Sequence, residues 1–143
     1  MAVSRTLTDL GQIRVLQGHF AEAKAFAAEG VTLSLQLGDV REIAWYLEIF
    51  AATHAAQGDA GRAARLWGSL DRLLESVGAP LMPEFMLRDP YLNGARESLG
   101  EPAFQDALSE GRAMSLKQAV QYALAETFHD RVADDAVGRG LSE

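Results

Sequence analysis

The chain has 143 residues, no cysteine and a formal net charge of -7. This length suits one domain with a core of its own. The lack of cysteine excludes disulfide scaffolds, thiolate metal sites and cysteine nucleophiles. A negatively charged surface repels phosphate, so we expect no direct binding of nucleic acid by this chain. No apolar run could span a bilayer, and the N-terminus lacks an apolar signal segment. We therefore expect a cytoplasmic protein without membrane contact.

The sequence favours helix along its length. Proline occurs four times, and three of the four fall between residues 80 and 90. Alanine and leucine are frequent, and both lose little side-chain entropy in a helix. Alternating strand patterns bounded by turns are absent. The sequence thus predicts an all-α fold of antiparallel helical hairpins.

The sequence also repeats itself at an offset of forty residues. Gaps are not needed, and the matches fall where a packed helix pair needs small residues or helix ends. The matched pairs include Gln17-Gly18 with Gln57-Gly58, Ala23 with Ala63, Leu33 with Leu73, and Gly38 with Gly78.

Each unit is predicted to be a helical hairpin, the first over about 5–37 and the second over about 40–77. In the first unit the helices cover about 5–17 and 20–37, and glycine ends each of them. The expected core stripe of the helix over 20–37 is Ala23, Phe26, Ala27, Gly30, Leu33 and Leu37, and that of the matching helix is Ala63, Leu66, Trp67, Leu70, Leu73 and Val77. Trp45 and Tyr46 are adjacent, so one of them must point away from the core.

Capping helices are predicted over about 83–126. A short helix is expected at 83–87, and a longer one starts at Asp89-Pro90 and stops at Gly100. Another covers 101–113, and the last follows a capping box of Ser115 and Gln118. We expect residues 1–126 to form a single domain, a short right-handed solenoid closed by these helices. Residues 127–143 are expected to be a polar, frayed tail.

The repeated units resemble the tetratricopeptide repeat (TPR). The resemblance rests on Leu10-Gly11 and Ala23 in the first unit and on Leu47, Ala51 and Ala63 in the second. The units are longer than the usual repeat and lack its terminal proline. In such repeats the residues of the first helices that lie off the core stripe line a concave groove. Here the expected lining is Arg5, Thr8, Gln12, Trp45, Glu48 and Ala52. This groove could hold a peptide or a small ligand; the alternative is a plain solvated face.

The second half is similar to the C-terminal region of large bacterial LuxR/MalT-like ATP-dependent transcriptional regulators. The similar segments are Ala64–Gly68, Glu75–Pro80, Ser98–Phe104, Glu110–Leu116 and Ala119–Leu124. The resemblance implies a fragment or small relative of such a regulator, which receives a signal from a protein or a small inducer. No Walker-type phosphate loop and no basic recognition helix occur, so ATPase and DNA-binding functions are expected elsewhere.

The sequence offers no set of catalytic residues. His19, His54 and His129 have no metal-ligand spacing with acidic residues or with one another, and no Gly-x-Ser-x-Gly elbow occurs. We expect no enzyme, no cofactor and no metal site. The leading prediction is a non-enzymatic protein–protein interaction module that receives signals, with a protein or other domains of a parent regulator as its partner. The alternatives are a small-molecule inducer sensor and a self-association module that dimerises through the apolar side of the first helix.

Overall fold

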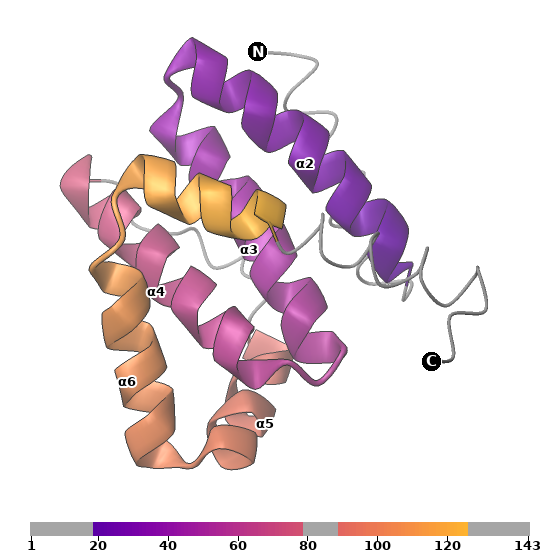
Figure 1. Cartoon of the computed structure of the whole chain (residues 1–143), viewed down its shortest axis with the longest axis vertical. Helices are drawn as coiled ribbons and strands as arrows, with labels where there is room; N and C mark the ends of the chain where they lie inside the picture. Colours follow the sequence, from indigo (N-terminus) through magenta and orange to yellow (C-terminus); the bar gives the residue numbers. More distant parts are fainter. Residues whose placement is uncertain (1–18, 79–88, 126–143) are drawn as a thin grey trace, which may run out of the picture.

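The computed structural model describes residues 19–78 and 89–125, and the described residues contain helices and no strand, as an all-α fold requires. The helices are α2 (Phe20–Leu37), α3 (Val40–Ala56), α4 (Ala60–Ser76), α5 (Asp89–Leu99) and α6 (Glu101–Arg112), followed by helical residues 116–125 (Figure 1). These bounds confirm the predicted helices over 20–37, 40–77 and 89–113 to within a few residues. The predicted helices at 5–17 and 83–87 and the tail at 127–143 lie outside the described residues.

Residues chosen for their backbone preferences set the helix ends. Gly38 ends α2 in the left-handed conformation at φ 71°, and its N–H donates to the carbonyl of Leu35. Glycine reaches this conformation without steric cost. Asp39 and Asp59 cap α3 and α4, each accepting a hydrogen bond of 3.2 Å from the backbone N–H three residues on. The predicted box is confirmed, because Ser115 and Gln118 exchange hydrogen bonds of 2.8 and 3.2 Å.

The start of α2 lacks the cap that the equivalent helix α4 has. His19 stands where the repeat places Asp59, and its side chain makes no capping hydrogen bond. We expect His19→Asp to stabilise the fold by about 0.5–1 kcal/mol, because the carboxylate can accept from the first turn of α2. Urea unfolding measures the gain. His19→Asn can make the same capping hydrogen bond without a charge, so it separates the two contributions to stability. An Asn variant less stable than the original chain would contradict the expectation.

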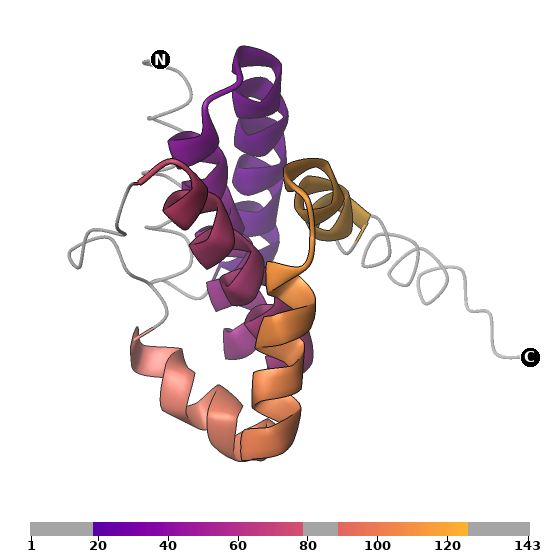
Figure 2. The same cartoon turned by 90° about the vertical axis from the view of Figure 1, so that its left-hand side faces the viewer.

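Helices α2 and α4 pack against α3, which lies between them (Figure 1). Helix α6 packs along α4, and α5 contacts α3, α4 and α6 (Figure 2). The equivalent residues Ala23 and Ala63 have no exposed surface, and Ala51 of α3 has none either. Small side chains at these positions let the backbones of neighbouring helices approach closely. Within the described residues, α2 and α4 therefore both lie in close contact with α3.

The core stripe of α2 differs from the predicted one at its last turn. Ala23, Ala27 and Gly30 are buried as expected, but Leu37 keeps 48% of its surface exposed. Phe26 and Leu33 are half-buried, and the buried positions include Val31 and Ser34 instead. Val77, the equivalent of Leu37, is likewise 45% exposed. Each of these residues directly precedes a glycine in the left-handed conformation, at the end of its helix.

Helices α4 and α6 cross at two glycines. A side chain at Gly111 would overlap the backbone carbonyl of Arg65, and one at Gly68 would overlap the backbone carbonyl of Leu108. At each glycine, the main chain of the other helix thus packs against the position that a side chain would fill. The crossing brings together two of the segments that resemble the bacterial regulators, 64–68 and 110–116.

None of the helices in the described part of the chain has the length and apolar character needed to cross a membrane.

Candidate interaction surface

The predicted groove residues that the structure describes all belong to α3. These are Trp45, Glu48 and Ala52, whereas Arg5, Thr8 and Gln12 lie outside the described residues. Helix α3 contacts α2, α4 and α5, and twelve of its residues are buried. A helix that is apolar nearly all round packs largely in an interior. The segment 43–52 has this character, since Glu48 is its only charged residue.

Glu48 and Ala52 lie one turn apart, and neither has exposed surface. The sequence predicts that the side of this helix away from its core stripe faces solvent. At Glu48 and Ala52 it does not, because neighbouring parts of the chain cover both residues. A partner meeting the molecule in this arrangement would not touch them. Whether any of the six predicted residues binds a partner stays a prediction.

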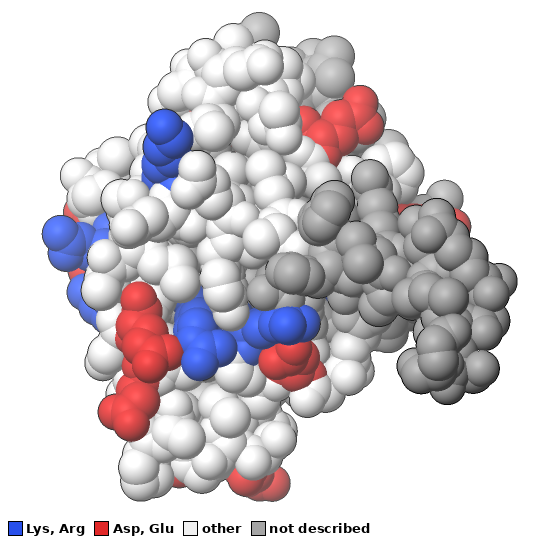
Figure 3. All heavy atoms as spheres, viewed as in Figure 1, with Lys and Arg blue, Asp and Glu red and all other residues white. Residues whose placement is uncertain are grey.

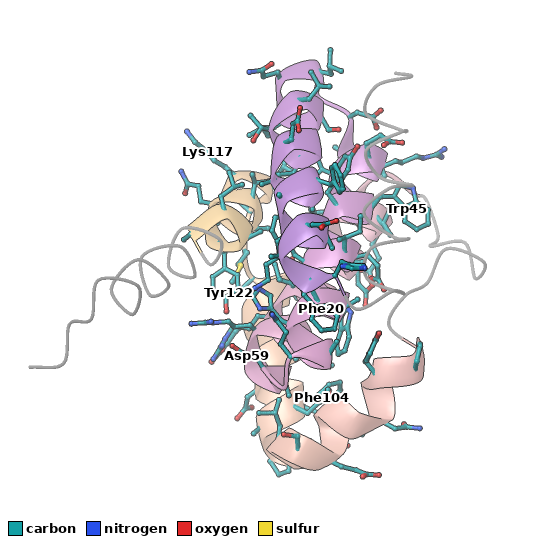
Figure 4. All side chains as sticks on the ribbon, turned by 90° about the vertical axis from the view of Figure 1, so that its right-hand side faces the viewer. Phe20, Trp45, Asp59, Phe104, Lys117 and Tyr122 are labelled. Carbon is teal, nitrogen blue, oxygen red and sulfur yellow. The ribbon has the colours of Figure 1, made fainter. Side chains whose placement is uncertain are left out.

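Trp45 is the most accessible of the three, being half-buried. Its neighbour Tyr46 is fully buried, and the Tyr46 ring lies where a side chain on Gly30 of α2 would stand. The prediction that one of the two aromatics points away from the core is confirmed. In Figure 4, Trp45 and Tyr122 lie on opposite sides of the molecule. Trp45 therefore belongs to a surface away from the helical residues 116–125.

His54 is 2% exposed near the end of α3, and the adjacent Thr53 donates a hydrogen bond of 2.7 Å to the carbonyl of Ile49. His54 is therefore a buried side chain of the helical core and does not face solvent. In the described ranges, no three His, Cys, Asp or Glu side chains gather closely enough to hold a metal ion.

A second polar arrangement joins α4 to the C-terminal helices. Arg65 Nε donates to Glu110 Oε1 at 2.7 Å, and Arg65 Nη1 lies 3.5 Å from the Tyr122 hydroxyl. Arg112 makes two hydrogen bonds, of 2.7 and 3.0 Å, to the Glu75 carboxylate. The hydrogen bond from Arg112 lowers the pKa of Glu75. The hydrogen bonds to Glu110 and Tyr122 raise the pKa of Arg65.

These four charged side chains satisfy one another, so they fasten the α4–α6 contact more readily than they bind a ligand. Spacing alone did not single them out, because the pairs lie 45 and 37 residues apart in the chain. The only sequence signal was the resemblance to the regulators, whose segments contain all four of these residues. Exposed pairs of this type contribute little to stability, and the bidentate geometry of Arg112 with Glu75 serves mainly to fix orientation.

The charged groups on the face shown in Figure 3 are mixed in sign. Lys and Arg side chains lie beside Asp and Glu side chains, and broad uncharged regions separate them. A surface that grips nucleic acid instead gathers its basic side chains in a patch or stripe. The face shown in Figure 3 has no such patch or stripe.

Compared with models of known protein families, with curated proteins and with solved structures, the chain shows no significant match. The resemblance to tetratricopeptide repeats and to bacterial regulators therefore rests on the sequence segments themselves.

Proposed function

We propose that the chain is a non-enzymatic protein–protein interaction module, built as a tetratricopeptide-like solenoid, that receives signals for a bacterial transcriptional regulator. The observation that carries the proposal is the repeated geometry. Helices α2 and α4 occupy equivalent positions in the forty-residue repeat, and both pack on α3. Their matched alanines, Ala23 and Ala63, have no exposed surface. Their terminating glycines share the left-handed conformation, at φ 71° and 67°. Stacked hairpins of this kind offer extended surfaces for partners.

Trp45 is the residue we assign to partner contact. Tryptophan is enriched among the residues that dominate binding energy at interfaces, because it buries a large apolar area. Here it is half-buried on α3, the helix that the surrounding elements hold in place. Such support keeps the ring preorganised, so little conformational entropy is lost on binding. Glu48 and Ala52 contribute by holding the helix, since both are fully buried.

A photo-crosslinking amino acid at position 45 tests the assignment in the native cell. We expect it to crosslink one defined protein. The matched control is the same amino acid at Ser98, an exposed residue of α5. Equal crosslinking at both positions, or none at position 45 in a folded chain, would contradict the interaction surface.

The identity of the captured protein tests the regulatory part separately. A protein with ATPase and DNA-binding regions is the expected result. A crosslinked protein without either region would leave the interaction module standing and overturn the link to transcription.

A further inference from the structure

Two exposed aliphatic side chains meet at the end of the molecule where α2 and α4 stop. Leu37 is 48% exposed and Val77 is 45% exposed. Both line one shallow, open depression of about 440 Å³, whose remaining lining is Gly38, Asp39, Val40 and Arg41. Figures 1 and 2 place the ends of α2 and α4 beside the start of α3. Single exposed aliphatic residues are ordinary, but two in one depression form a local apolar patch.

The repeat presents these two side chains in equivalent positions. They are forty residues apart, and each directly precedes a glycine in the left-handed conformation. The helix ends are thereby fixed by backbone geometry, and the aliphatic pair stands on a rigid support. Val40 is half-buried and adds a third aliphatic side chain to the same lining.

The depression carries one charge of each sign beside its apolar centre. Arg41 is exposed and makes no ion pair with any side chain in the described ranges. Asp39 also lines the depression, and it accepts the hydrogen bond from Glu42 N–H through Oδ1 only. The local charge is thus zero, although the whole chain carries -7. A purely acidic or purely basic partner would leave one of the two charges facing a like charge.

We propose that this depression is the interface of a two-fold homodimer, with a second copy of the chain as its occupant. A two-fold axis brings the same patch together from both copies, so a self-complementary patch is what such an interface requires. Arg41 of each copy then meets Asp39 of the other, around a centre of Leu37 and Val77. An apolar centre with a charged rim is the usual arrangement of protein interfaces. The patch is small, so the dimer is weak and depends on protein concentration.

Sedimentation velocity of the full chain over a wide concentration series tests the dimer. We expect a rising dimer fraction, and we expect Val77→Glu to abolish it by placing a carboxylate at the apolar centre. Arg41→Glu should abolish it too, because it then faces Asp39. Asp39→Asn keeps the helix cap and should weaken the dimer and reduce its dependence on salt. Circular dichroism establishes that each variant is folded, which substitutions at exposed positions permit.

Leu35→Glu is the matched control, since Leu35 is 37% exposed but does not line the depression. It should leave the dimer intact. A chain that is monomeric at every concentration, as expected if an unrelated protein occupies the depression, overturns the proposal. So does a dimer that survives Val77→Glu, which would place the contact elsewhere, for example on the apolar side of the predicted first helix. The outcome is independent of the crosslinking at position 45.

Discussion

Gly111→Ala is expected to destabilise the fold by about 3 kcal/mol. The new methyl group would overlap the carbonyl oxygen of Arg65, a backbone atom of α4 that cannot rotate away. Helix α6 would have to move off α4, which would loosen the contacts that Arg65 and Arg112 make across the two helices. Helix propensity alone predicts the opposite sign, because alanine is favoured over glycine by about 1 kcal/mol in a helix interior. Urea unfolding followed by circular dichroism decides between the two.

Gly94→Ala is the matched control for this experiment. Gly94 lies inside α5, and a side chain there meets nothing within 4 Å. Propensity then acts alone, and we expect a gain in stability of up to about 1 kcal/mol. If Gly111→Ala gave the same gain, the close crossing of α4 and α6 would be wrong.

Local signals predicted the helices of this chain well. Gly38, the pair Asp89-Pro90, Gly100 and the box of Ser115 and Gln118 predicted helix ends to within a few residues, because each acts within one helical turn. The glycines at 68 and 111 show where such reasoning ends. A glycine inside a helix indicates that something packs too closely there to leave room for a side chain. The partner that requires it, the main chain of a helix about forty residues away, follows only from how the helices cross.

The groove was harder to predict than the helices. A hairpin repeat suggests that a helix has one buried stripe and one open side, and Glu48 and Ala52 were assigned to the open side on that basis. The structure surrounds α3 with α2, α4 and α5, and both residues are buried. The segment's composition carried a usable signal, because ten residues with a single charge are unusual on a solvated face. A lone glutamate in such a segment is better interpreted as a buried polar group.

Trp67→Ala is expected to cost about 3–5 kcal/mol, the usual range for deleting a fully buried aromatic side chain. Trp67 has no exposed surface and lies on α4, the helix that contacts α3, α5 and α6. Its removal leaves a cavity in the core beside α4, and close-packed helices collapse only partly into such a cavity. The free energy of unfolding in urea measures the loss.

Two further variants give the Trp67 experiment its contrast. Trp67→Phe retains most of the apolar area, so we expect a loss well below that of the alanine variant. Trp45→Ala removes the same side chain from a half-buried position, where less apolar surface leaves water on folding. If Trp45→Ala cost as much stability as Trp67→Ala, Trp45 would belong to the core and the surface assigned to partner contact would be wrong. If it cost much less, Trp67 is the tryptophan that packs the core, and Trp45 stays available for the proposed contact.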